Sequence, residues 1–578
     1  MVVSTDSKTS AEKKLTIQTA AIADNTTAIR SLDWDRDRFD IEFGLQNGTT
    51  YNSYLIRSDK VALVDTSHEK FRELYIGTLQ GLIDPSIIDY IVISHTEPDH
   101  SGLVRDILEL APHATVVGAK VALQFLDDLV HRPYEKKVVK NGDQLDLGNG
   151  HILEFVSAPN LHWPDSQFTF DHKTQILYTC DAFGMHFCSE AVFDEDFTRV
   201  EPDYRFYYEC LMAPNARSVL SAMKRMKKLG DIGKVATGHG PLLLHHLPQW
   251  LELYETWSKA KSKADTLAAV FYVSDYGYSD RLSQAVAHGL TKTEVAVEMM
   301  DLRSADVHDI QELVSKAKGI VLMMPPSSGA IAAQCRSALG TLMASVNTKQ
   351  GIGLVESYGG DDEPIDPLAN KFRELELKDG FAPIRVKTEP TDVTYQLCEE
   401  AGTDFGQKLV LKKRAKQTKS NNNELLKALG RLSGGLYIIT AKKGHVTGAM
   451  LASWVAQASF EPLGFTVAVA KDRAIESLMQ VGDRFNLNVL EEGKHQPLMK
   501  HFLKRFAPGA DRFEGVQTQT GANGSPILTE ALAYLECKVV SRMECSDHWL
   551  IYSQVEEGRV SNASGETAVH HRKVASYY

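Results

Sequence analysis

Short apolar runs recur along the first 245 residues, and several of them lead directly into a histidine or an aspartate. The runs YIVIS (90–94), ILEFV (152–156) and ILYTC (176–180) are short and rich in β-branched or aromatic residues, which predicts buried strands. Helical patterns lie between some of these runs. Because loops carry most binding and catalytic residues, we expect the chemistry of this region at the strand ends.

The pattern changes after about residue 262. From the strand-like run LAAVFYVSD (267–275), apolar runs and helical patterns alternate, which predicts a doubly wound parallel sheet. The segment KKRAKQTKSNNN (412–423) is polar and basic, as expected of a linker. A β-rich region follows. We therefore predict an α/β multidomain chain with domains at 1–262, 263–411 and 424–578.

Composition narrows the class of protein. The net charge of -12 argues against a nucleic-acid partner, which normally meets a basic face. No apolar run approaches the roughly 18 residues that span a membrane, and the N-terminal residues lack the apolar core of a secretory signal. We expect a soluble, cytoplasmic protein without a transmembrane segment. The 7 cysteines include no Cys-x-x-Cys pair, which predicts scattered, reduced core cysteines.

A cluster of potential metal ligands follows the apolar run that ends at Ile93. His95, Glu97, Asp99 and His100 lie together in HTEPDH, and His162, Asp181 and His239 follow later predicted strands. An isolated loop histidine is more often structural, but this combination favours a metal site. Seven donors exceed the needs of one tetrahedral ion and suit two first-row ions that share a carboxylate. Asp181 is the best candidate for that bridge, whereas other histidines of the region, such as His186, are expected to be surface or structural.

The order and spacing of these residues resemble the metallo-β-lactamase superfamily, whose zinc hydrolases carry H-x-H-x-D-H. Here the second histidine is replaced by Glu97, and a carboxylate favours iron over zinc. H-x-E-x-D-H resembles the flavodiiron proteins, which implies an αββα sandwich with a catalytic di-iron centre. The resemblance implies that one iron binds His95, Glu97 and His162 and that the other binds Asp99, His100 and His239, with Asp181 between them.

The middle region resembles a flavodoxin that binds FMN. Three candidate loops follow predicted strands: SDYGYSD (274–280), MPPSSGA (324–330) and SYGGDDEP (357–364). The first can wrap a phosphate at the start of a helix, whereas the third turns acidic at 361–363, unlike many relatives. The residues expected to contact FMN are Ser274, Asp275, Tyr276, Gly277, Tyr278, Ser279, Pro325, Pro326, Ser327, Ser328, Gly329, Ser357, Tyr358, Gly359 and Gly360.

The C-terminal region resembles the flavin reductases, split β-barrels that bind FMN and accept hydride from NAD(P)H. The resemblance implies a second flavin near Thr447, Ser453, Asp547 and His548. Gly448, Ala449 and Ala452 replace the family's small polar residues, so a barrel that binds little or no flavin is the alternative.

The order of the three regions matches the flavodiiron class of oxygenic phototrophs. It implies an electron relay from NAD(P)H, or from another donor such as reduced ferredoxin, through FMN to two irons that reduce O2 to water. It also implies a head-to-tail homodimer or a heteromer with a paralogue. Nitric oxide reduction and a zinc-dependent hydrolase remain alternatives at this point.

Overall fold

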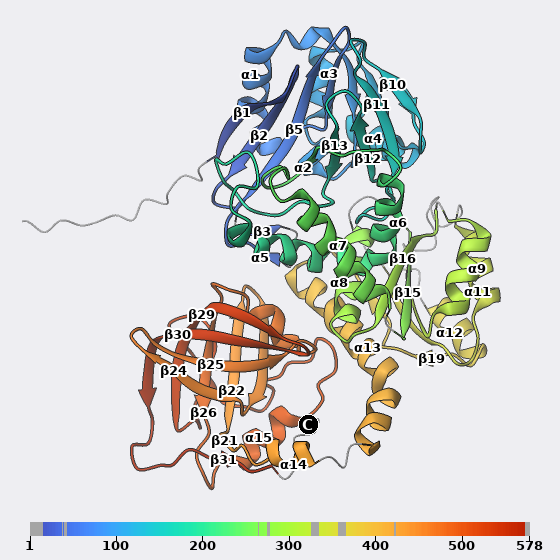
Figure 1. The fold of residues 1–578 in the computed structure, drawn as a ribbon. Helices are drawn as coiled ribbons and strands as arrows, with labels where there is room; N and C mark the ends of the chain where they lie inside the picture. Colours follow the sequence, from blue (N-terminus) through green and yellow to red (C-terminus); the bar gives the residue numbers. More distant parts are fainter. Residues whose placement is uncertain are drawn as a thin grey trace, which may run out of the picture. The chain divides into compact units, whose positions relative to one another are not determined.

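The chain divides into two compact units, Met1–Ser262 and Lys263–Tyr578 (Figure 1). The structure is a computed structural model, and it describes residues 15–36, 38–39, 43–263, 265–273, 278–303, 305–324, 335–356, 366–420 and 424–572.

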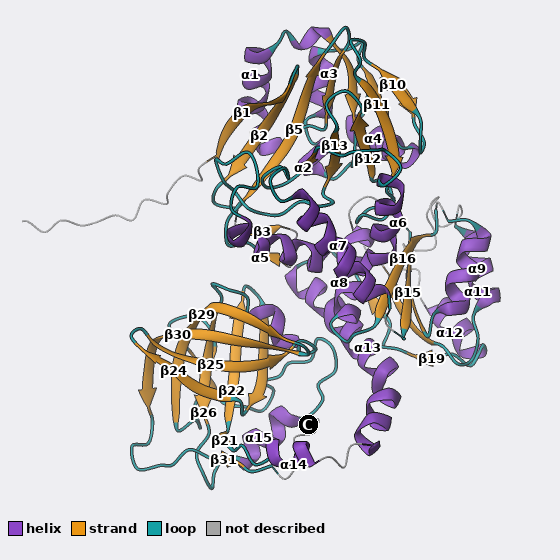
Figure 2. Ribbon diagram, viewed as in Figure 1, coloured by secondary structure: helices purple, strands orange, loops and turns teal. Residues whose placement is uncertain are grey.

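The first unit contains two sheets that pack face to face, with helices on their outer sides (Figure 2). The seven-stranded sheet has the order β1 (Leu15–Ala23), β2 (Thr26–Asp33), β5 (Thr49–Arg57), β6 (Val61–Val64), β7 (Ile88–Val92), β8 (Thr115–Gly118) and β9 (Glu135–Val138). The five-stranded sheet has the order β10 (Gln144–Asp146), β11 (Ile152–Ser157), β12 (Gln167–Asp171), β13 (Ile176–Cys180) and β14 (Lys234–Thr237). A small pair, β3 (Arg38–Phe39) and β4 (Phe43–Gly44), lies apart from both.

Three hydrophobic layers hold this unit together. Between the sheets, Tyr54 and Val92 of the first sheet belong to the same buried cluster as Phe155 and Tyr178 of the second. Helices α1 (Arg72–Leu82), α3 (Val104–Leu110) and α4 (Lys120–Val130) supply the layer outside the first sheet. Helices α5 (Phe197–Tyr207), α6 (Ala216–Met226) and α7 (Leu247–Ser262) supply the layer outside the second. The predicted αββα sandwich is therefore confirmed.

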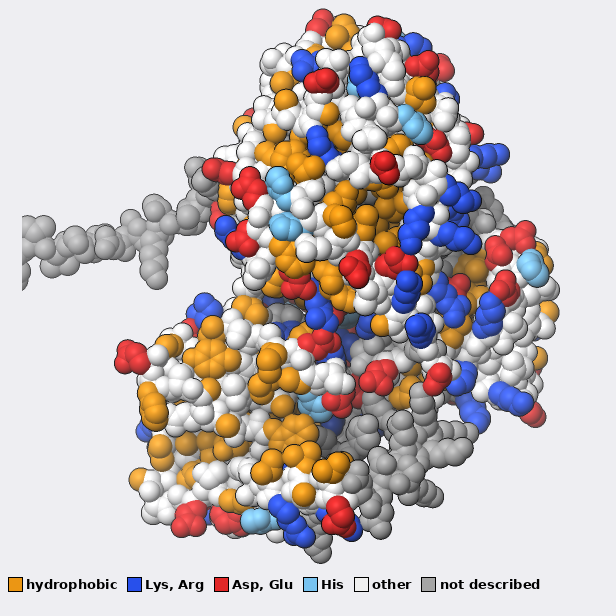
Figure 3. All heavy atoms as spheres, in the orientation of Figure 1, with side chains coloured by type: hydrophobic (Ala, Val, Ile, Leu, Met, Phe, Trp, Pro, Cys, Tyr) orange, Lys and Arg blue, Asp and Glu red, His pale blue; other side chains and the backbone are white. Residues whose placement is uncertain are grey.

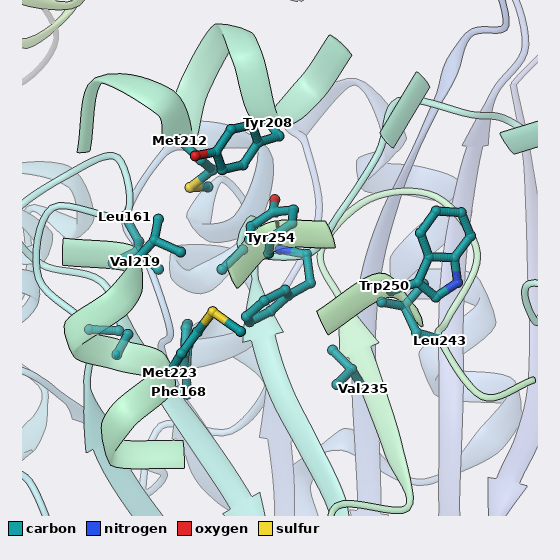
Figure 4. Packing of buried hydrophobic residues seen from close by; sticks show 14 of the residues in the cluster. Leu161, Phe168, Tyr208, Met212, Val219, Met223, Val235, Leu243, Trp250 and Tyr254 are labelled. Carbon is teal, nitrogen blue, oxygen red and sulfur yellow. Dashed lines mark hydrogen bonds between the residues drawn. The ribbon is translucent and has the colours of Figure 1, made fainter. Parts of the chain in front are cut away.

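The layer of helices outside the second sheet holds the strand ends from which candidate metal ligands emerge. Figure 4 shows Met223 of α6 near Phe168 of β12, and Trp250 of α7 above Val235 of β14. All four side chains are almost completely buried. Because interiors are packed to near-crystalline density, the ends of β12, β13 and β14 are held firmly in place.

The second unit begins with a parallel sheet in the order β16 (Ala296–Asp301), β15 (Leu267–Tyr272), β17 (Gly319–Met324), β18 (Gly351–Glu356) and β19 (Lys378–Asp379), with β20 (Ile384–Arg385) also paired to β18. Counted from β15, the order is 2-1-3-4-5, which is that of flavodoxins. The accompanying helices are α8 (Tyr278–Thr291), α9 (Val307–Lys316), α11 (Arg336–Ser345), α12 (Asp366–Glu374) and α13 (Asp392–Ser420). The predicted doubly wound domain is confirmed.

Glycines allow α8 and α13 to pack unusually closely. A Cβ atom on Gly402 would overlap the carbonyl oxygen of Val286, and one on Gly289 would overlap the carbonyl oxygen of Glu399. A Cβ on Gly406 would meet the Thr293 side chain. The two helices therefore form one tightly packed pair, with little room for a side chain between them.

The last domain is built on a seven-stranded antiparallel sheet. Its order is β23 (Val446–Ala452), β22 (Tyr437–Lys443), β26 (Arg484–Val489), β29 (Ala533–Cys545), β30 (His548–Val560), β25 (Leu463–Ala470) and β24 (Val455–Phe460). Shorter elements are α14 (Glu424–Leu429), α15 (Gln496–Leu503), the 3-10 turn η5 (Ala474–Leu478), and the pairs β21 (Gly434–Gly435) with β31 (Val569–His570) and β27 (Thr518–Thr520) with β28 (Pro526–Leu528). A core of residues such as Ile439, Phe485 and Ile551 fills the sheet's inner side.

Figure 3 shows hydrophobic side chains gathered on one face of this domain, at lower left. Large exposed side chains in the domain include Phe460, Leu463 and Met543, and Phe460 is 83% exposed. Six of the seven cysteines are buried as expected, but Cys545 is exposed. None of the described helices is both long and apolar enough to cross a membrane.

Most of the segment predicted as a linker, 412–423, is helical. Helix α13 continues to Ser420, and positions 421–423 lie outside the described residues. The segment is rich in Lys, Arg, Gln and Ala, all of which have high helix propensity. Its polarity does not stop a helix, and its role as a linker stays a prediction.

The close packing of α8 and α13 gives a test of the middle domain. We expect Gly402→Ala to destabilise that domain by about 1–3 kcal/mol, because overpacking forces the helices apart. Gly340→Ala is a matched control, since Gly340 lies in α11 with nothing within 4 Å of its would-be Cβ. Calorimetry should show a lower melting temperature for the first variant only. Equal melting temperatures would contradict the packing described.

Candidate metal centre

The first four candidate ligands lie just beyond β7. His95 and Glu97 occupy the loop, and Pro98 begins the single turn α2 (Pro98–Ser101), which carries Asp99 and His100. Proline is favoured at a first helical position, because it lacks an N–H and has a helical φ. The turn is anchored where Thr66 donates to the carbonyl of His100 through its backbone N–H, at 2.7 Å. This turn holds Asp99 and His100 beside the loop that carries His95, and the His95 and His100 rings lie 5.9 Å apart, centroid to centroid.

The other three ligands come from the second sheet. His162 lies between β11 and β12, Asp181 follows β13, and His239 follows β14. Because β13 and β14 are parallel neighbours, their carboxyl ends meet at one edge. Gly238 is required there: a Cβ would lie 2.7 Å from the His100 ring and 3.1 Å from the Cys180 backbone.

One group of donors gathers around one oxygen of Asp181. His162 Nε2 lies 3.1 Å from Asp181 Oδ2 and 3.1 Å from Glu97 Oε2. His95 Nε2 lies 3.3 Å from Glu97 Oε2 and 3.6 Å from Asp181 Oδ2. One donor atom from each of these four residues lies within 4.8 Å of every other.

A second group gathers around the other oxygen of Asp181. His100 Nε2 is 3.0 Å and His239 Nε2 is 3.2 Å from Asp181 Oδ1. Asp99 lies 3.5 Å from His100 Nε2 through Oδ1 and 3.3 Å from His239 Nε2 through Oδ2. The structure thus brings all seven predicted ligands together, in the two sets that the resemblance implies. Their role as ligands remains a prediction.

The spacing of the donors fits metal coordination. Metal–donor bonds of about 2.1 Å that meet at about 90–110° separate neighbouring donors by about 3.0–3.4 Å. The histidine–carboxylate distances in both sets run from 3.0 to 3.6 Å. Four imidazoles and three carboxylates also suit first-row divalent ions. The residues therefore fit two metal ions.

Because the carboxylates of the site are buried, positive charge beside them is strongly favourable. Burial alone would raise the pKa of Glu97, but hydrogen bonds from His162 and His95 lower it to about 2. Burial alone would lower the pKa of His239, but Asp181 and Asp99 raise it to about 10. Protonated histidines can thus balance the buried carboxylates, and metal ions that bind there displace those protons.

Asp165 fixes the orientation of one imidazole, and sequence reasoning missed it. Its Oδ1 lies 3.0 Å from His95 Nδ1, and its Oδ2 accepts from the Thr96 backbone N–H at 2.8 Å. The signal available in the sequence was an aspartate three residues after His162. On the other side, His239 Nδ1 donates to the Thr50 carbonyl at 2.6 Å, and a backbone acceptor leaves no side-chain signal. Such partners orient metal-binding histidines.

Two further buried side chains border the second set. Tyr207 donates its hydroxyl to Asp181 Oδ1 at 2.9 Å, and burial raises its pKa well above the usual range. The His186 ring lies 4.6 Å from the His239 ring, centroid to centroid, and burial lowers its pKa well below the usual range. The phenol therefore keeps its proton, and His186 is neutral. His186 is not a surface residue, in contrast to one of the two roles expected for it.

Most of the predicted FMN contacts lie outside the described residues: Ser274, Asp275, Tyr276, Gly277, Pro325, Pro326, Ser327, Ser328, Gly329, Ser357, Tyr358, Gly359 and Gly360. Tyr278 opens α8, but its side chain is not described. Ser279 is buried in the first turn of α8. The three loops follow β15, β17 and β18, which are adjacent parallel strands, and this is the edge at which such sheets bind ligands.

The structure brings together only some of the residues predicted to bind a second flavin in the C-terminal domain. Asp547 Oδ1 lies 2.9 Å from His548 Nδ1, and the His548 ring lies 5.1 Å from Trp454. Ser453, which precedes Trp454, is buried, and its Oγ has no hydrogen-bond partner among the described residues. Thr447 lies in β23, opposite Lys442, and no described contact joins it to this group.

The orienting contact from Asp165 can be tested directly. We expect Asp165→Asn to weaken iron binding about 10- to 100-fold, as is typical when such a partner is lost. Anaerobic Fe(II) titration of the apo-protein measures the change. Asp171→Asn is a matched control, because Asp171 forms a comparable buried pair with His151, at 2.8 Å. Equal iron affinity in the Asp165 variant and the wild type would contradict the role of Asp165.

Comparisons with known proteins agree with this geometry. Residues 49–240 match the ODP family beta lactamase model, and residues 429–577 match the flavin reductase like domain model. The chain is 67% identical to diflavin flavoprotein A 1 of Synechocystis sp., over 98% of this chain and 99% of that protein. It is 66% identical to the putative diflavin flavoprotein A 3 of Nostoc sp., with the same coverage.

A solved structure agrees as well. The metal-soaked Flv1 flavodiiron core from Synechocystis sp. is 38% identical, with a TM-score of 0.64, and the match covers 68% of this chain and 98% of that one. Family membership implies an oxidoreductase with flavin and a di-iron site, and it sets aside the zinc hydrolase alternative. The chain belongs to the diflavin flavoproteins, the flavodiiron family with a fused flavin reductase domain.

Proposed function

We propose that this chain transfers electrons from NAD(P)H, or from another low-potential donor, through FMN to a di-iron site that reduces O2 to water. The observation that carries the proposal is the Asp181 carboxylate, which presents one oxygen to each donor set. Two irons held there, together with flavin, can supply the four electrons that O2 requires to reach water.

The residues around the site would each have a defined task. His95, Glu97 and His162 would hold one iron, Asp99, His100 and His239 would hold the other, and Asp181 would join them. Asp165 and the Thr50 carbonyl keep two of the imidazoles oriented. The Tyr207 hydroxyl keeps a proton beside Asp181, at a place where oxygen reduction consumes protons.

The flavin domains would supply electrons. FMN would bind at the carboxyl edge of β15, β17 and β18, near Ser279, and a second flavin would bind near Ser453, Asp547 and His548 of the C-terminal domain. Ser453 supports the second site, because its buried hydroxyl lacks a described partner. We carry over the head-to-tail homodimer, or a heteromer with a paralogue, as part of the proposal.

Oxygen uptake with a catalase step tests the proposal. We expect the iron- and FMN-loaded protein to consume O2 with NADH, NADPH or reduced ferredoxin, and catalase added at the end to return none. A return of about half the oxygen would show release of peroxide and would contradict reduction to water. Rapid anaerobic consumption of NO with slow O2 uptake would identify nitric oxide as the substrate instead.

Variants of the metal centre separate its contribution from that of the flavin. We expect Asp181→Ala or His162→Ala to abolish reduction to water while the flavin spectrum stays largely intact. Any remaining O2 uptake should then yield peroxide from reduced flavin. His172→Ala is a suitable control, because His172 pairs with Glu154 on the surface, away from the seven donors. Full turnover to water in the Asp181 variant would refute the metal-site assignment.

A further inference from the structure

A chain of four buried charges joins the C-terminal domain to the flavodoxin-like domain within the second unit. Lys292, just after α8, pairs with Glu399 of α13 and, at 2.8 Å, with Glu476 of η5. Glu476 in turn pairs with Arg542 of β29. Each of the four side chains is at least 91% buried, with exposed fractions of 8%, 4%, 7% and 9%. We refer to Lys292, Glu399, Glu476 and Arg542 as the ionic latch.

Each domain contributes one positive and one negative member to the ionic latch, and the buried Lys292–Glu476 pair joins the two domains. Lys292 and Glu399 come from the flavodoxin-like domain, and Glu476 and Arg542 come from the C-terminal domain. Burial alone would lower the pKa of Lys292 and raise that of Glu399. The pairing outweighs burial, and it lowers the pKa of Glu399 to about 2. Because a buried charge without its partner is strongly unfavourable, separation of the domains requires these side chains to regain water.

One face of α13 carries further contacts to the C-terminal domain. Gln396, Glu400, Asp404 and Gln407 recur at helical spacing, so they lie along the same side of the helix. Glu400 accepts from Arg512 at 2.9 Å and from the Gly509 backbone at 2.9 Å.

The neighbouring positions continue the contact. Asp404 accepts from Arg505 Nε at 3.0 Å, and Gln407 donates to the Asp472 carbonyl at 3.1 Å. Ser477 donates to Gln396 at 3.2 Å. The contact therefore extends along about three turns of α13.

The helix pair beneath this contact is itself closely packed. The glycines of α8 and α13 bring the two helices together, as described above, and α8 begins at the predicted FMN phosphate loop. A domain that docks on the pair of α8 and α13 is therefore connected, through α8, to the predicted FMN phosphate loop.

We propose that the ionic latch and the α13 face dock the C-terminal domain permanently on the flavodoxin-like domain, so that the two act as one rigid body. The alternative is a reductase domain that swings on the segment after α13 and meets its partner transiently. Permanent docking would fix the distance between the two flavin-binding domains within each chain.

A distance measurement tests this proposal independently of catalysis. Cys545 is the one exposed native cysteine, and Lys349→Cys adds a second exposed position in the flavodoxin-like domain. We expect electron–electron double resonance between spin labels at these sites to give one narrow distance distribution. Dilution with unlabelled chain removes distances between subunits. A broad distribution in this otherwise wild-type protein would overturn the proposal.

Variants of the ionic latch complete the test. We expect Lys292→Met to abolish the narrow peak, because Glu399 and Glu476 then lose the cation between them. Glu476→Gln is a second latch variant, which keeps the Lys292–Glu399 pair and the shape of the side chain. It tests the same prediction if the Lys292→Met protein retains less FMN than the wild type. Glu556→Gln is the control, because it removes an exposed pair with Arg484 inside the C-terminal domain. An unchanged narrow peak in both latch variants would contradict the role of the latch.

Discussion

The two oxygens of the Asp181 carboxylate are the feature on which the candidate site depends. One oxygen faces His162 and His95, and the other faces His100 and His239. The strand before it ends in an unusual conformation: Cys180 has a φ of 52°, a left-handed value that is uncommon for residues other than glycine. Such a conformation costs on the order of 1 kcal/mol or more. Here it turns the chain so that Asp181 enters the space between the two donor sets.

The fold supplies the stability that such a site requires. Seven ionisable side chains lie within a sandwich built on hydrophobic cores, and their burial would be unfavourable without pairing or metal. The packing of α6 and α7 over β12–β14 holds the strand ends firmly (Figure 4). Asp165 and the Thr50 carbonyl then orient imidazoles from opposite sides. The precision of the site therefore comes from the cores around it as much as from the ligands.

The sequence allowed the seven donors to be predicted, because motif spacing and strand ends are local signals. It did not reveal Asp165 or Thr50, since a hydrogen bond to a ligand's other nitrogen depends on tertiary placement. The polar composition of 412–423 predicts a linker but does not reveal that α13 continues to Ser420, because a polar segment with high helix propensity can remain helical. The ionic latch was also missed: its four members are separated by as many as 250 positions in the chain, and each alone resembles an ordinary surface charge. Most predicted FMN contacts lie outside the described residues and stay predictions.

The second unit shows a related use of buried charge. In the metal site, protons on the histidines or bound metal ions can balance the charge of the buried carboxylates. In the ionic latch, each domain supplies a pair of opposite charges, and Lys292 of one pair also binds Glu476 of the other. Buried charges therefore favour the binding of metals in one case and the docking of a neighbouring domain in the other.

The central claim is that Asp181 joins two donor sets into one dinuclear iron site. Mössbauer spectroscopy of the 57Fe-loaded, oxidised protein tests it most directly. We expect two irons per chain in a magnetically coupled pair, and the loss of that coupled signal in Asp181→Ala. Isolated ferric signals in the wild type, or one tightly bound ion per chain, would contradict it.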